Sequence, residues 1–158
     1  MEEYNMTDEM KKEFTLKISQ ANKSRILVLT YELALQYIDD AREAQDRDEF
    51  NRGIQHAKNC VDQLRNVLDY SQEISLYLYR IYNYTFIILD KAMIRHNAAL
   101  LSEAKVILKK LHDAFDHVAS MDTSETVMKN IETVYSGITY GRNGIRDNVA
   151  MTNRGAIA

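Results

Sequence analysis

The sequence contains no proline and no tryptophan, and only five glycines. Proline fixes φ and removes a backbone donor, so its absence allows long helices to run without interruption. Four of the glycines lie from Gly137 onward, and a glycine inside a helix costs about 1 kcal/mol relative to alanine. This distribution predicts a helical body followed by a looser tail.

Cysteine and long apolar runs are also scarce. Cys60 is the single cysteine, which excludes an internal disulfide and a cysteine zinc cluster. The longest strongly apolar stretch, Ile81 to Leu89, is far shorter than the roughly 20 residues of a membrane span. The N-terminus is acidic, unlike a secretory signal. We therefore expect a cytoplasmic protein with no membrane insertion.

The charge balance argues against nucleic-acid binding. The net charge is −3, and no basic stripe is present to displace the counterions of a phosphate backbone. A chain of 158 residues fits one domain and can bury a core without metal or disulfide cross-links.

Apolar residues recur in steps of three and four along four long segments, as on amphipathic helices. The segments run from about 24 to 44, 49 to 68, 72 to 95 and 98 to 119. Short connections favour antiparallel neighbours. An aspartate of the run 46–48, Asn97, and either Asp69 or Ser71 are candidate N-caps. We predict an all-α fold, an antiparallel up-down four-helix bundle within residues 1–120.

A short amphipathic helix is expected before the bundle, at about residues 3–18. Its apolar side recurs every fourth residue and comprises Met6, Met10, Phe14 and Ile18. Beyond Ser120 the pattern weakens. Thr123 to Val134 could form one more short helix, and residues 121–158 as a whole read as a short helix and a flexible tail.

No arrangement of side chains predicts metal chemistry. Di-iron bundles use inward-facing Glu-x-x-His pairs, and this sequence has none. The best metal-like group is His112, Asp113, Asp116 and His117, which flanks core positions and is interpreted as an exposed charged face. We expect no metal and no cofactor.

Two pairs of polar residues are candidates for catalysis. Cys60 has His56 one turn away but no orienting third group, and a free cysteine usually behaves as a small buried hydrophobe. Arg52 and His56 resemble the pair of HEPN-type RNases, but they stand closer together than that pattern requires. We expect no enzyme and no catalytic residue.

Tyrosine is the abundant feature. Of ten tyrosines, five lie from Tyr70 to Tyr84, and all of these but Tyr70 fall within the most apolar segment. Tyrosine combines an apolar ring with a polar tip and is enriched at interfaces. One helix cannot hide every face inside a four-helix bundle, so part of this segment is available either to the core or to a partner.

Four stretches resemble the FliS-type flagellin-export chaperones. Tyr31-Glu32-Leu33-Ala34 is similar to the family's LYDGA segment, and Gln63-Leu64-Arg65 with Leu68-Asp69 resembles the end of its next helix. Leu111-His112-Asp113-Ala114-Phe115 is similar to LRDAW. The closest similarity is to the family's L-x-x-L-Y-x-Y-x-x-x-x-L-x-x-A, and is carried by Ile74, Leu78, Tyr82-Asn83-Tyr84, Leu89 and Ala92.

Three positions depart from the family pattern. Lys23-Ser24 stands where the family usually has Ser-Pro or Thr-Pro, Leu33 replaces a glycine, and Phe115 replaces a tryptophan. A larger side chain at Leu33 would reshape a groove on that face.

The resemblance implies a holding function. Such a chaperone binds the disordered C-terminal segment of flagellin, prevents premature polymerisation in the cytosol and aids type III export. It would be a monomer that binds one flagellin and meets the flagellar export apparatus. Amphipathic peptide helices would lie in grooves between the bundle's helices.

We predict two flagellin-binding surfaces and a cover. One surface is Ile26, Leu29, Leu33 and Tyr37, and the other is Tyr77, Ile81, Tyr84 and Ile88. The leader, through Met6, Met10, Phe14 and Ile18, would cover part of a groove when cargo is absent, because methionine adapts to irregular surfaces.

Two alternatives stay open at this point. One is a generic helical adaptor that dimerises through its tyrosine-rich helix. The other is a degenerate HEPN-type RNase that uses Arg52 and His56.

Overall fold

The computed structural model describes residues 7–124, apart from the side chain of Ser19, and each element in this range is a helix. The helices are α1 (Asp8–Ser19), α2 (Lys23–Arg42), α3 (Arg47–Asn66), α4 (Ile74–Arg95) and α5 (Ala98–Met121). The predicted all-α class is confirmed for the described residues. The four long helices begin and end within two residues of the predicted bounds. Met6, most of the predicted short helix at 123–134 and the tail lie outside the described residues.

Side-chain caps explain why α3 and α5 begin where they do. Asp46 Oδ1 accepts a hydrogen bond from the Glu49 backbone N–H at 2.8 Å, and Glu49 Oε2 accepts one from the Gln45 N–H at 2.9 Å. At the start of α5, Asn97 Oδ1 accepts from the Ala99 N–H at 3.0 Å. Both caps satisfy backbone donors that a helix leaves unpaired, as the sequence predicts.

The predicted cap of α4 is wrong. Asp69 Oδ1 accepts hydrogen bonds from the Ser71 backbone N–H at 3.0 Å and from Ser71 Oγ at 2.6 Å. These bonds form a local turn that occupies both candidate caps. The helix begins later, at Ile74, after Glu73, which makes no side-chain cap bond.

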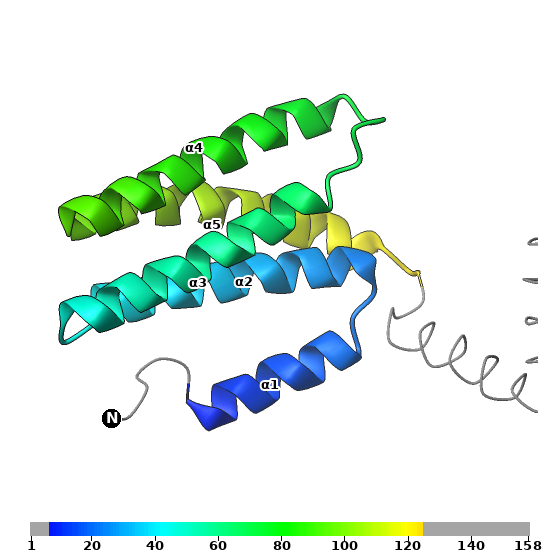
Figure 1. The fold of residues 1–158 in the computed structure, drawn as a ribbon. Helices are drawn as coiled ribbons and strands as arrows, with labels where there is room; N and C mark the ends of the chain where they lie inside the picture. Colours follow the sequence, from blue (N-terminus) through cyan, green and yellow to red (C-terminus); the bar gives the residue numbers. More distant parts are fainter. Residues whose placement is uncertain (1–6, 125–158) are drawn as a thin grey trace, which may run out of the picture.

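The four long helices form a ring. α2 packs against α3 and α5, and α4 packs against the same two helices. Figure 1 shows the chain reversing direction at each connection from α2 to α5. α1 packs against α2, and it lies on the side of the ring opposite α4 (Figure 1). No helix within residues 7–124 is long and apolar enough to cross a membrane.

The core lies inside this ring. Its largest fully buried apolar side chains come from all four helices: Tyr31, Ile38, Ile54, Leu64, Leu89, Leu101 and Leu108. Burial of each large side chain stabilises the fold by about 1.5–3 kcal/mol. The hydroxyls of Tyr31 and Tyr82 hydrogen-bond to each other within the core, and the Phe115 ring stacks on Tyr31 with centroids 5.5 Å apart.

Close approach of α2 and α3 depends on Gly53. A Cβ at this position would lie 2.9 Å from Ala41 Cβ and 3.0 Å from the Tyr37 carbonyl oxygen. A buried glycine in α3 therefore lets the two backbones pack tightly along this edge.

Candidate binding groove

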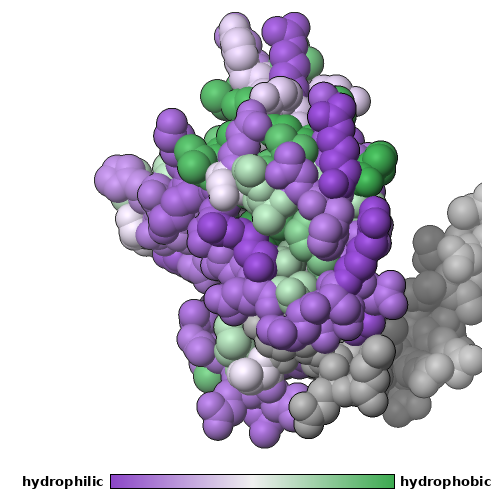
Figure 2. Space-filling model, turned by 90° about the vertical axis from the view of Figure 1, so that its left-hand side faces the viewer, coloured by the Kyte–Doolittle hydropathy of each residue, from purple (hydrophilic) through white to green (hydrophobic). Residues whose placement is uncertain are grey.

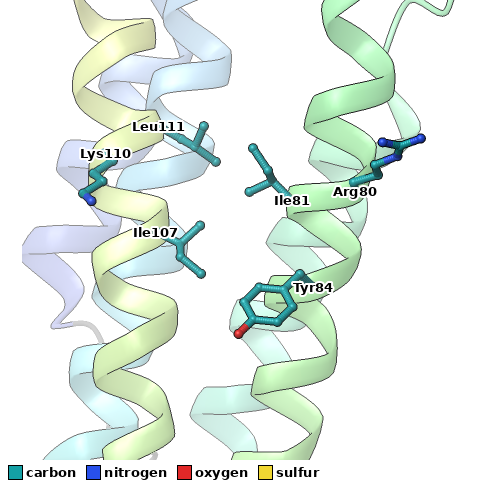
Figure 3. A pocket seen from close by; sticks show the side chains of 6 residues that line it. All are labelled: Arg80, Ile81, Tyr84, Ile107, Lys110 and Leu111. Carbon is teal, nitrogen blue, oxygen red and sulfur yellow. The ribbon is translucent and has the colours of Figure 1, made fainter.

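An apolar groove runs between α4 and α5, with a volume of about 400 Å³. Its lining residues are Arg80, Ile81, Tyr84, Ile107, Lys110 and Leu111. Figure 3 shows Ile81 on α4 facing Ile107 and Leu111 on α5, while Arg80 and Lys110 point outward on opposite sides. The groove is thus an apolar floor bordered by two cations.

Ion pairs close the neighbouring edge between α2 and α5. Arg25 Nη1 lies 2.6 Å from Asp116 Oδ1, and Lys105 Nζ lies 2.6 Å from Asp39 Oδ1. His112 adds a third contact, with its Nε2 3.2 Å from a carboxylate oxygen of Glu32.

Polar and aromatic contacts likewise join α3 to α4. Lys58 forms an ion pair with Asp90, and Arg65 Nη1 donates to Asn83 Oδ1 at 2.7 Å. The Arg65 guanidinium also lies over the Phe86 ring, 4.4 Å from its centroid, which is a favourable cation–π geometry.

The edge between α4 and α5 has one such contact among the described residues. The Tyr84 hydroxyl donates to Glu103 Oε1 at 2.7 Å, and this hydrogen bond raises the pKa of the tyrosine. No ion pair joins these two helices within residues 7–124. Among the described residues, fewer polar contacts thus join α4 to α5 than join the two edges above, and a groove lies at this edge.

The predicted surface on α4 divides into open and buried parts. Tyr77 and Tyr84 are 57% and 51% exposed, and Ile81 is half-buried in the groove floor. Ile88 is buried in the core instead. Tyr82 is also in the core. Figure 2 shows apolar side chains gathered where α4 and α5 lie, in the upper part of that view.

The predicted surface on α2 is largely covered. Leu29 is only 4% exposed although it is not part of the central core, and α1 packs against this helix. Ile26 and Leu33 are half-buried, and Leu33 packs against the central core. The Tyr37 ring stacks on His56 with centroids 4.7 Å apart.

The leader helix is only partly buried. Met10 and Phe14 are half-buried, whereas Ile18 is 40% exposed. Thr7 caps the helix by accepting from the Met10 N–H at 3.2 Å. Because α1 lies beside α2, it does not cover the α4/α5 groove in this arrangement (Figure 1).

Sequence reasoning missed the α5 wall of the groove and both bordering cations. Leu111 enters the sequence pattern only through the family motif, and Ile107 is not part of that motif. A second apolar row on α5 was available as a signal, because Leu100, Ile107, Leu111 and Val118 follow at steps of seven, four and seven.

The metal-like group of α5 is engaged in hydrogen bonds and ion pairs. His112 Nδ1 lies 2.9 Å from Asp113 Oδ1, and Asp116 accepts from Arg25. Within residues 7–124, no group of three or more histidine, cysteine or carboxylate side chains is placed to hold a metal ion.

Cys60 and His56, from the candidate catalytic pairs, are also held by their surroundings. Burial raises the pKa of the Cys60 thiol to about 12, which disfavours the thiolate that a nucleophile requires. His56 is stacked against Tyr37.

The fold and groove together define a helical-bundle protein with a surface suited to an amphipathic helix. A comparison with family models matches residues 6–136 to "FliS: Flagellar protein FliS". The chain belongs to this family, the flagellar export chaperones, which confirms the resemblance found in the sequence. A search of the curated proteins finds no match.

Proposed function

We propose that this protein is a cytosolic chaperone that holds the C-terminal segment of flagellin in the α4/α5 groove. It would keep that segment from polymerising before type III export and release it at the export apparatus. The observation that carries this proposal is an open apolar groove in a member of the flagellar protein FliS family. A peptide that folds on binding gives up part of its binding energy to ordering, which suits a cargo that must be released.

The groove floor fits an amphipathic helix. Ile81, Ile107 and Leu111 present aliphatic side chains toward one another, and Tyr84 adds an aromatic ring. A bound helix would place apolar residues at positions i, i+3, i+4 and i+7 against them. Burial of one aliphatic side chain is worth about 1.5–3 kcal/mol, so two floor residues supply a measurable share of the affinity.

Calorimetric titration with a synthetic peptide of the flagellin C-terminal segment tests the proposal. Ile81→Ser combined with Leu111→Ser should weaken binding about tenfold or more, because 1.4 kcal/mol corresponds to a factor of ten. Ile94→Ser is the matched control, since Ile94 lies on the same helix but is 73% exposed outside the groove. Absence of binding heat with the unaltered protein would contradict the proposal.

The proposed function also predicts a stoichiometry. One flagellin segment should bind one chain, and light scattering should give the mass of a one-to-one complex. A stable dimer of the free protein would favour the adaptor alternative instead.

We also propose that α1 covers a second apolar surface on α2. The burial of Leu29 outside the central core, on the helix against which α1 packs, supports this proposal. Ile26 would extend that surface when α1 moves away, whereas Leu33 and Tyr37 pack against the core.

A further inference from the structure

The two cations beside the groove have no partners among the described residues. Arg80 on α4 and Lys110 on α5 make no hydrogen bond or ion pair within residues 7–124. Their neighbours differ: Lys105 pairs with Asp39 at 2.6 Å and Lys109 pairs with Asp113 at 3.0 Å. Arg80 and Lys110 are therefore available to an incoming chain.

Further cations continue the α4 side of the groove. Arg80, Lys91 and Arg95 fall within about 60° of one another around the helix axis, at 3.6 residues per turn. All three are exposed, and none forms an ion pair with a described residue. Asp90, the carboxylate of α4, is already paired with Lys58. A chain with net charge −3 thus carries a cationic border along this helix.

A carboxylate, Glu103, also lies on the α5 side of the groove. Glu103 accepts the hydrogen bond of Tyr84 at 2.7 Å. Tyr84 belongs to the groove lining, so this contact links the two helices within the same site as Arg80 and Lys110. The groove therefore offers an apolar floor with one cation on each side, Arg80 and Lys110, and a carboxylate on the α5 side, Glu103, that is hydrogen-bonded to Tyr84 (Figure 3).

We propose that the groove selects an amphipathic helix with carboxylates on both flanks of its apolar stripe. This inference rests on the proposed function and adds the charge pattern of the bound segment. A helix with side chains is about 10–12 Å wide, so residues beside its stripe would face Arg80 on one side and Lys110 on the other. Charge complementarity at the border of an interface contributes mainly to specificity and to the association rate.

Two synthetic peptides with identical leucine stripes test the charge pattern. One carries glutamates on both flanks, and the other carries lysines. At low salt, the acidic peptide should bind the unaltered protein about tenfold tighter than the basic one, as measured by fluorescence anisotropy. The difference should shrink at about 1 M salt, where the screening length falls to about 3 Å.

Charge reversal identifies the residues responsible. Arg80→Glu combined with Lys110→Glu should reverse the preference, so that the basic peptide binds tighter. Lys11→Glu combined with Lys12→Glu is the matched control, because it makes the same change in net charge on exposed positions of α1. The control should keep the preference for the acidic peptide. Equal affinities for the two peptides, or a preference that the groove reversal leaves unchanged, would overturn the inference.

The flagellin C-terminal peptide separates this inference from the proposed function. If that peptide binds the unaltered and charge-reversed proteins equally well, the charge inference fails and the proposed function stands. If the acidic peptide binds in the groove and the flagellin peptide does not, the proposed function fails and the charge pattern stands. A dimer that the acidic peptide cannot dissociate would assign the groove to a second copy of this chain and overturn the inference.

Discussion

At the scale of single residues, the core contains two buried tyrosine hydroxyls, and each one is the hydrogen-bond partner of the other. The hydroxyls of Tyr31 and Tyr82 hydrogen-bond across the bundle, from α2 to α4, and burial raises the pKa of both. A buried hydroxyl left without a partner costs about 1–3 kcal/mol, whereas removal of both hydroxyls is nearly neutral.

Tyr82→Phe should therefore lower the free energy of unfolding by about 1–3 kcal/mol, because it leaves the Tyr31 hydroxyl unpaired. The double variant with Tyr31→Phe should lose less than either single variant. Urea unfolding of the four proteins measures the coupling. Additive losses would show that the two hydroxyls act independently.

Asp40 is a buried carboxylate whose Oδ2 has no hydrogen-bond partner within residues 7–124, while Oδ1 accepts from Gln36 at 2.9 Å. Burial, followed by repulsion from Asp39 and Glu43, raises the pKa of Asp40. The charged form is therefore disfavoured in the folded state. Ionised Asp40 therefore destabilises the folded state. This effect is absent below the ordinary aspartate pKa of about 3.9 and develops as pH rises through the folded-state pKa.

Asp40→Asn should raise the free energy of unfolding at pH 7 by about 1 kcal/mol, because the amide is neutral and can still accept from Gln36. The gain should shrink as pH falls toward 4. Urea unfolding across this pH range measures it, with Asp48→Asn as an exposed control on α3. A gain that does not depend on pH would mean that the charge of Asp40 is not its cause.

At the scale of helices, the contact between α2 and α3 opposes intrinsic helix propensity. Gly53→Ala would improve the propensity of α3 by about 1 kcal/mol. The added Cβ would lie 2.9 Å from Ala41 Cβ and 3.0 Å from a backbone oxygen of α2. Overpacking of this kind typically costs about 1–3 kcal/mol, so the variant should be less stable overall.

Thermal unfolding shows whether Gly53→Ala lowers or raises the stability. Gln63→Ala is the control, at an exposed position of α3. The control should stay within about 0.5 kcal/mol of the unaltered protein. A more stable Gly53→Ala variant would show that the helices can separate at little cost.

Helix bounds were predictable from the sequence because apolar residues spaced three and four positions apart lie on the buried side of each helix. The start of α4 was not, because Asp69 and Ser71 satisfy each other in a turn before the helix begins. Periodicity also placed Tyr84 and Ile88 on one row of α4. Their different burial depends on the neighbouring helix, which no local pattern records.

At the scale of the whole molecule, the open edge is determined by contacts between distant residues. Arg25 with Asp116 and Lys105 with Asp39 close the α2/α5 edge, and Lys58 with Asp90 joins α3 to α4. The sequence identified α4 as a helix with excess apolar surface. The sequence also contains the apolar row of Ile107 and Leu111 on α5, but which helix faces that row depends on the arrangement of the four helices.

The two proposed surfaces lie on opposite sides of the molecule, which makes the role of α1 testable. Deletion of residues 1–18 should tighten binding of the flagellin C-terminal peptide by roughly tenfold, if uncovering Leu29 and its neighbours supplies about 1.4 kcal/mol. The α4/α5 groove lies away from α1 and should not change (Figure 1). The gain should therefore persist in the Ile81→Ser, Leu111→Ser background.

Calorimetry on the full-length and shortened proteins, each with and without the two groove substitutions, separates the surfaces. A gain that disappears with the groove substitutions would place the effect of α1 on the α4/α5 groove. Unchanged or weaker binding after deletion would mean that α1 belongs to the permanent packing of α2. In that case Leu29 belongs to the permanent packing between α1 and α2, and the α4/α5 groove is the surface left for cargo among the two proposed here.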